Sequence, residues 1–136
     1  MRLFGIDYGT KRVGLALSDE SGRFAFPYRV LTNTGSQKLT DEIAAVCQKE
    51  KVRRIVLGES RNYRGEANPV MKQIETLKKR LVEKTGLPVT LEPEFLTSAE
   101  AERLQGKTAE HDAAAAALIL KSYIDKYDLP PGGLVK

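Results

Sequence analysis

The stretch that decides the fold lies at the start of the chain and reads Leu3-Phe4-Gly5-Ile6-Asp7-Tyr8-Gly9-Thr10-Lys11-Arg12-Val13-Gly14-Leu15-Ala16-Leu17-Ser18. Two apolar runs flank a polar turn that contains glycine, a pattern that predicts an antiparallel β-hairpin. A turn at Ser21-Gly22 then leads to a third strand expected near 24–31, where Pro27 indicates an edge position or an interruption.

Strands and helices alternate after this hairpin. The apolar spacing predicts amphipathic helices, and a continuous apolar run predicts a buried parallel strand. The expected elements are a helix at 36–51, a strand at 53–58, a helix at about 68–84, a strand at 89–91 closing near 92–94, a short helix at 97–104, a polar loop at 105–110 and an Ala-rich helix from about 112. This order predicts one α/β domain over residues 1–128, with a mixed five-stranded sheet, helices on both faces, and a flexible tail at 129–136.

The composition sets broad limits on function. The 136 residues include 41% hydrophobic and 29% charged residues, which excludes general disorder. The net charge of +4 suits a partner that carries phosphate, although many other proteins share it. With Cys47 and His111 as the only cysteine and histidine, a Cys/His zinc site is excluded, so a metal site must rest on carboxylates. Asp7 comes too early for a signal peptide, and no apolar run is long enough to span a bilayer, so we expect a cytoplasmic protein without a membrane partner.

Three carboxylates occupy special places in the expected fold. Asp7 ends the first strand, Glu94 follows the last strand, and Asp112 opens the final helix. Ligand sites gather beyond the carboxyl ends of parallel strands, so these side chains are candidates to converge. Mg²⁺ suits such a group because it prefers oxygen ligands, and two such ions can stabilise both the attacking and departing oxygens of a phosphoryl displacement.

Each carboxylate also has a simpler interpretation. Taken alone, Asp112 is better explained as an N-cap or a first-turn acid stabilised by the helix dipole, and Glu94 as a solvated loop residue. Asp7 is harder to explain in this way, because an acid at the end of an apolar strand is costly to desolvate without a partner. Spacing alone does not show that the three meet.

The hairpin turn offers groups that suit a phosphate. Gly9 permits a tight turn, Thr10 adds a hydroxyl, and Lys11 and Arg12 add cationic donors. An ordinary polar turn with two solvated bases explains the same residues. An Asp-x-Gly-Thr start is also typical of actin-like ATP-binding domains, but those usually bind nucleotide between two related domains and this chain has room for one.

Several segments together resemble the YqgF family, over nearly the whole chain. They are Ile6 to Gly14, the loop from Gly58 through Asn62 to Gly65, Glu94-Phe95-Leu96-Thr97-Ser98, and Asp112 to Leu120 followed by Ser122-Tyr123. Members are described as Holliday-junction resolvases or pre-16S rRNA nucleases with an RNase H-like fold. The resemblance therefore implies a hydrolase that cuts phosphodiester bonds in structured nucleic acid, in pre-16S rRNA 5′-end processing and ribosome biogenesis or in Holliday-junction resolution.

The resemblance also implies roles for individual residues. It makes Asp7, Glu94 and Asp112 the catalytic acids that bind Mg²⁺ or Mn²⁺. The implied substrate contacts are Thr10, Lys11, Arg12 and Asn62. The implied partners are pre-rRNA or branched DNA, with a ribosomal precursor as a further possibility, and the protein would be a monomer or a homodimer.

The chain departs from the family pattern near the expected site. Phe95 stands where the family usually has Arg, Glu59-Ser60 replaces Leu-Pro, and Pro93 replaces an Asp. The polar stretch at 104–110 is also shorter than the usual basic loop. These differences keep a second hypothesis open, in which the fold serves as a non-catalytic nucleic-acid or ribosome-assembly binding module.

Overall fold

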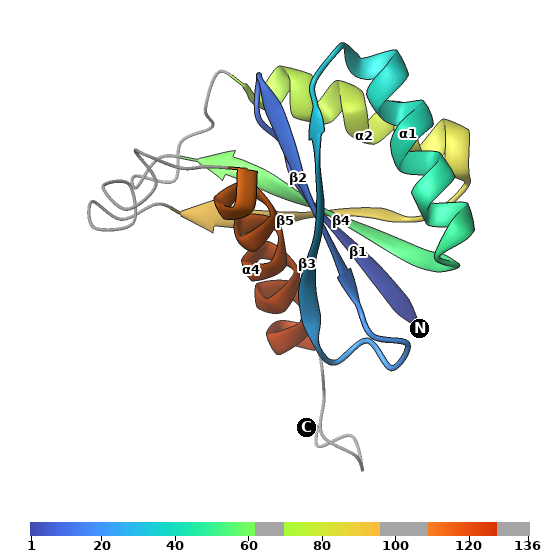
Figure 1. The fold of residues 1–136 in the computed structure, drawn as a ribbon, viewed down its shortest axis with the longest axis vertical. Helices are drawn as coiled ribbons and strands as arrows, with labels where there is room; N and C mark the ends of the chain where they lie inside the picture. The colour runs from blue at the N-terminus through green and yellow to red at the C-terminus, as the bar shows by residue number, and fades with distance from the viewer. Residues whose placement is uncertain (62–69, 96–108, 128–136) are drawn as a thin grey trace.

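One five-stranded sheet organises the chain in the computed structural model, which describes residues 1–61, 70–95 and 109–127 (Figure 1). The described elements are β1 (Arg2–Asp7), β2 (Arg12–Ser18), β3 (Ala25–Thr32), α1 (Ser36–Lys49), β4 (Val52–Arg61), α2 (Met71–Thr85), β5 (Val89–Phe95) and α4 (Ala109–Tyr127). The short helix expected at 97–104 and the tail expected from 129 lie outside the described residues.

The strands are ordered β3-β2-β1-β4-β5 across the sheet. β1, β4 and β5 run parallel, whereas β2 is antiparallel to both of its neighbours. Helices α1 and α2 cover one face and α4 covers the other (Figure 1). The predicted mixed sheet with helices on both faces is confirmed. It follows that the carboxyl ends of β1, β4 and β5 lie at the same end of the sheet.

The edge strand β3 confirms both expectations for Pro27. β3 pairs only with β2, and the pairing shifts register between Leu15 and Ala16, where Pro27 lies opposite Ala16. An edge strand tolerates a residue without an N–H group because one of its sides has no ladder to maintain.

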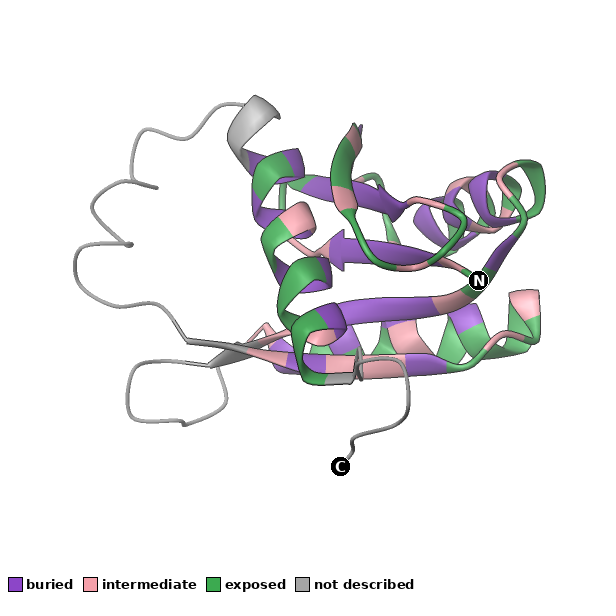
Figure 2. Ribbon diagram, turned by 90° about the horizontal axis from the view of Figure 1, so that it is seen from below, coloured by how far each residue is buried: buried purple, intermediate pink, exposed green. Residues whose placement is uncertain are grey.

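Alternation along the strands produces two unequal cores (Figure 2). The larger core lies between the sheet and helices α1 and α2, and its fully buried side chains include Phe4, Ile6 and Leu15. The smaller core lies between the sheet and α4, where Val56, Ile119 and Leu120 are buried. Period-two alternation sends successive side chains of one strand to opposite faces, so the two cores share every central strand.

Small residues let α4 lie very close to the sheet. A Cβ added to Gly14 would stand 1.9 Å from the backbone oxygen of Asp112, and one added to Gly5 would stand 2.9 Å from that of Ala116. On the helix side, Ala113 and Ala116 are buried against the strands. The Ala-rich helix therefore packs closely on the sheet, and this packing fixes the start of α4 directly over β2.

Three element boundaries differ from the sequence-based expectation. β4 extends to Arg61 and β5 to Phe95, because parallel pairing continues through Ser60 opposite Glu94 in a stretch whose charges suggested a loop. α4 begins at Ala109, so Asp112 lies inside the first turn and does not open the helix. Glu94 is correspondingly a strand residue and not part of a solvated loop.

Candidate active site

Asp7 is the last residue of β1 and is half-buried. Phe4 and Ile6 belong to the core under α1 and α2, whereas Leu3 belongs to the core under α4. Residues two apart on a strand share a face, so Asp7 belongs with Leu3 and Gly5 on the α4 face. The end of β1 thus presents its carboxylate toward the side of the sheet that carries Asp112.

Asp112 is one of the few buried charged residues in the described part of the chain, with a side chain only 5% exposed. Its Oδ2 accepts a hydrogen bond of 2.5 Å from Nε of Arg12, the first residue of β2, whose side chain is 43% exposed. This contact between opposite charges compensates the loss of water around the carboxylate, which would otherwise be strongly unfavourable.

The backbones of Asp7 and Asp112 approach the same residue. Asp7 is the register partner of Gly14 in the antiparallel β1–β2 pair, where opposite Cα atoms are roughly 4.5–5.5 Å apart. The backbone carbonyl of Asp112 lies against the other side of Gly14, in the space a Cβ would fill. Two acids 105 positions apart in the sequence are therefore neighbours, an arrangement that spacing alone did not establish.

Glu94 lies at the corresponding end of β5. Its backbone is paired with Ser60, one step before β4 ends. It is two positions beyond Glu92, the interval that returns a strand to the same face of its sheet. The side chain of Glu94 lies outside the described part of the structure, as does Asn62, so the expected roles of these two residues stay predictions.

Glu92 is a buried acid that sequence reasoning overlooked. Its carboxylate, 3% exposed, accepts a hydrogen bond of 3.0 Å from Ser122 and lies 2.8 Å from the ammonium of Lys126, both on α4. It therefore ties β5 to α4, the two elements that carry Glu94 and Asp112. Its partners are 30 or more positions away, so no local pattern could have revealed it.

The β1–β2 turn is held in place from the end of β3. Asn33 donates from its side chain to the backbone oxygen of Gly9 at 2.8 Å and from its backbone N–H to that of Lys11 at 2.9 Å. A Cβ on Gly9 would stand 2.4 Å from the oxygen of Arg12, which explains the glycine in this turn. Thr10 and Lys11 are exposed in this turn, and their role as phosphate contacts stays a prediction. Sequence reasoning missed Asn33 because its contacts are formed only by folding.

The chemistry of these side chains fits a divalent cation. Asp7 and Asp112 offer hard oxygen ligands, and the guanidinium beside Asp112 shows that this position accepts positive charge. Among the residues whose side chains are described, no three acidic, histidine or cysteine groups gather as a metal cluster. The role of Asp7 and Asp112 as metal ligands therefore stays a prediction.

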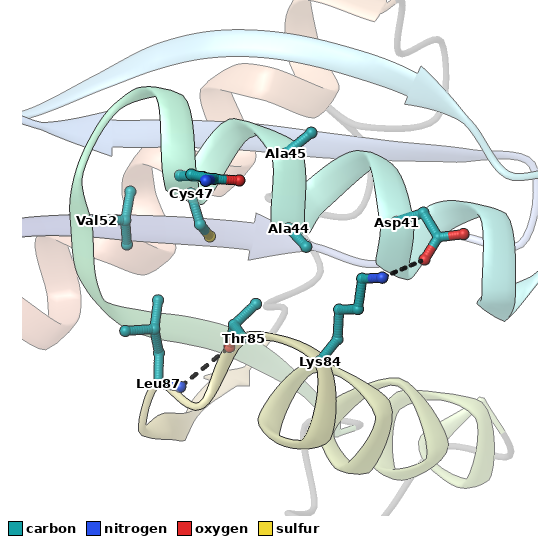
Figure 3. A pocket seen from close by; sticks show the side chains of 9 residues that line it. Asp41, Ala44, Ala45, Cys47, Val52, Lys84, Thr85 and Leu87 are labelled. Carbon is teal, nitrogen blue, oxygen red and sulfur yellow. Dashed lines mark hydrogen bonds and ion pairs between the residues drawn. The ribbon is translucent and has the colours of Figure 1, made fainter.

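A pocket of about 510 Å³ lies at the opposite end of the sheet, between α1 and α2 (Figure 3). It is lined by Val52, the first residue of β4, and by Leu87, which precedes β5. An ion pair of 3.6 Å joins Asp41 to Lys84 at its rim. Burial raises the pKa of the Cys47 thiol in this pocket to about 12. A thiol that stays protonated at neutral pH is a poor nucleophile, so Cys47 does not mark a second reactive site.

The strand order and the helices described on the two faces of the sheet define the RNase H-like, RuvC-like fold class. Thermus thermophilus RuvC in complex with a Holliday junction substrate superposes with a TM-score of 0.59, at 18% identity, over 93% of this chain and 97% of that chain. The chain belongs to the RuvX (YqgF) family, described as Holliday junction resolvase, whose sequence profile matches residues 1–126.

Relatives of similar length support this assignment. A protein of Nitratidesulfovibrio vulgaris (strain Miyazaki F) is 38% identical over 133 residues, covering 92% of this chain and 94% of its own. A protein of Opitutus terrae is 37% identical over 140 residues, covering 96% of both chains. Both are provisionally named pre-16S rRNA nucleases. The chain is thus a hydrolytic nuclease, of a class that uses a divalent metal and binds nucleic acid. Within the described residues, no helix has the length and apolar character needed to cross a bilayer.

Proposed function

We propose that the chain cleaves a phosphodiester bond in the 5′ region of pre-16S rRNA, with Asp7, Glu94 and Asp112 holding Mg²⁺ or Mn²⁺. The observation that carries the proposal is the packing at Gly14, which lies between the end of β1 and the first turn of α4 and brings the backbones of Asp7 and Asp112 together. Carboxylates gathered in this way repel one another unless cations compensate them.

RNA is favoured over branched DNA as the substrate, because the relatives named for rRNA share more sequence identity with this chain than the resolvase bound to DNA does. The relatives named for rRNA match at 37–38% identity over more than nine-tenths of the chain. The resolvase bound to junction DNA matches at 18% identity, which supports the fold only. Resolution of a four-way junction is the second candidate, because the family itself carries that description.

In this proposal, the three acids hold the metal on one side of the scissile phosphate, and the hairpin turn binds the phosphate on the solvent side. A bound divalent cation would stabilise the negative charge that develops on the phosphate oxygens. Asp7 and Asp112 would hold it from β1 and α4, and Glu94 would complete the set from β5. Thr10 and Lys11 in the exposed turn would bind and orient the phosphate on the solvent side. Asn33 would keep that turn in place through its two hydrogen bonds.

Asp7→Asn tests the metal assignment directly. An amide is a much poorer ligand for a hard cation, so we expect cleavage of a pre-16S rRNA fragment to fall on the order of 100-fold or more. Asp41→Asn is the matched control. It removes the same charge from a surface ion pair at the other end of the molecule and should leave the rate unchanged.

The same assay separates the alternatives when it is run with a structured RNA and a four-way DNA junction, each with and without chelator. Cleavage of RNA that chelator abolishes supports the proposal. Preferential cleavage of the junction would support the second candidate function, resolution of a four-way junction. Binding of RNA without any cleavage would identify a non-catalytic binding module, and undiminished turnover by a pure Asp7→Asn protein would remove Asp7 from the site.

A further inference from the structure

The ion pair between Arg12 and Asp112 raises a question about the order of events at the site. Nε of Arg12 lies 2.5 Å from Oδ2 of Asp112, an oxygen that the proposed function assigns to a metal. A guanidinium and a divalent cation repel each other strongly at such short range, above all beside a carboxylate that is only 5% exposed. The guanidinium of Arg12 and a divalent cation therefore compete for Oδ2 of Asp112.

We propose that Arg12 is a resident counter-ion that holds Asp112 before metal binds, and that the arriving cation displaces it. This inference rests on the proposed function, because it takes Asp112 to be a metal ligand. Without a positive neighbour, a buried carboxylate is expensive to keep ionised. Arg12 supplies that neighbour and so holds the Asp112 carboxylate in place in the metal-free protein.

The two partners differ in their freedom to move. Asp112 is fixed because its own backbone packs against Gly14 under α4. Arg12 begins β2 next to the turn, and its side chain is 43% exposed. A long side chain at the surface can swing its charged end into water while its stem stays near the protein. Arg12 is therefore the partner that leaves.

After its displacement from Asp112, the guanidinium of Arg12 would bind the substrate phosphate. It starts beside the exposed Thr10 and Lys11, at the rim where the phosphate is expected. A guanidinium released from a carboxylate can donate two parallel hydrogen bonds to phosphate oxygens. Metal loading would thus create a phosphate ligand that the metal-free protein lacks, and it would couple the binding of metal to the binding of substrate.

The first test measures binding of Mn²⁺ alone to the full chain by calorimetry. Arg12→Ala and Arg12→Gln remove the competing charge, so we expect both to bind Mn²⁺ on the order of tenfold more tightly than the unaltered protein. Arg29→Ala is the matched control. Arg29 lies on β3, exposed, with its guanidinium 5.3 Å from the ring centre of Tyr28, and its removal changes the net charge equally. Its affinity for Mn²⁺ should change less than about twofold.

The direction of the change distinguishes this role from a merely structural one. If Arg12 only positions Asp112, both Arg12 variants will bind Mn²⁺ more weakly, and weaker or unchanged binding overturns the inference while leaving the metal site in place. Failure of every protein to bind Mn²⁺ overturns the proposed metal site itself. The Gln variant keeps most of the side-chain stem, so it provides the measurement if the Ala variant does not fold.

The second test concerns the released guanidinium. Binding of a labelled structured RNA is measured with and without Ca²⁺, chosen as a hard cation that prefers oxygen ligands. The unaltered protein and Arg29→Ala should gain affinity for RNA when Ca²⁺ is added, and Arg12→Gln should gain on the order of tenfold less. Equal gains in all three proteins would overturn the phosphate role of Arg12.

Discussion

Gly14 adjoins both candidate acids, because its backbone pairs with Asp7 and its missing side chain leaves room for the backbone of Asp112. It faces Asp7 across the β1–β2 pair and receives the backbone of Asp112 from α4. A methyl group there would have to displace backbone, which cannot rotate away as a side chain can. The start of α4 would have to lift off the sheet, and Asp112 with it.

Gly14→Ala should therefore lower the free energy of unfolding by about 3 kcal/mol or more. Gly58→Ala is the matched control on the same face. Its new Cβ would stand 2.6 Å from Cδ1 of Ile119, the flexible end of a side chain that can change rotamer, so we expect a loss of about 1 kcal/mol. Denaturant unfolding of both variants measures the difference. Equal losses would show that the approach of Asp112 to Gly14 is not tight.

At the scale of elements, α4 is attached to the sheet at both of its ends. Arg12 holds the first turn through Asp112, and Glu92 holds the last turns through Ser122 and Lys126. The carboxylate of Glu92 is 3% exposed, whereas the Lys126 side chain is 51% exposed. Removal of the lysine therefore leaves a buried charge with less compensation, and removal of an ordinary surface lysine does not.

Lys126→Met should lower the free energy of unfolding by about 1–2 kcal/mol, because part of the desolvation penalty of Glu92 is then unopposed. Lys121→Met on the same helix breaks an exposed pair with Asp125 and should cost less than about 0.5 kcal/mol. Thermal or denaturant unfolding of the two variants compares them. Similar small losses would mean that Ser122 alone satisfies Glu92.

The elements themselves were largely predictable from sequence because their signals are local. Apolar runs, turn residues and the helical spacing of apolar residues indicated every strand and helix that the structure describes, and Pro27 correctly marked an edge strand with a register shift. The ends of β4 and β5 were predicted too short, since a polar strand end looks like a loop until its pairing partner is known. The pairing of Ser60 with Glu94 is that missing information.

The sequence predicted which residues belong to the candidate site but did not predict how they are arranged. Asp7, Glu94 and Asp112 could be selected from their places at strand and helix ends, and a family resemblance supported the choice. That Asp7 and Asp112 meet at Gly14, and that Arg12 pairs with Asp112, depends on contacts between distant segments. No single-sequence pattern encodes such contacts, and the same holds for Asn33 and Glu92.

At the scale of the whole molecule, the hairpin turn brings the cationic side chain of Arg12 to the buried Asp112. The net charge of +4 gives only a modest general attraction to nucleic acid. We expect the cationic groups of the hairpin turn instead to direct the phosphate toward Asp7 and Asp112. Lys11, exposed at the turn, should therefore contribute a specific phosphate contact, and lysines elsewhere should contribute little.

Each phosphate contact releases counter-ions, so the affinity for RNA should fall as salt rises, and the slope of log affinity against log salt counts the contacts. Lys11→Ala should reduce that slope by about one and weaken binding alike for all RNA sequences tested. Lys49→Ala, at the end of α1 and beside the amino ends of the parallel strands, removes an equal charge far from the acids and should leave the slope unchanged. Fluorescence anisotropy at several salt concentrations measures both slopes. An affinity insensitive to salt, or equal changes in the two variants, would mean that the nucleic acid does not enter across the hairpin turn.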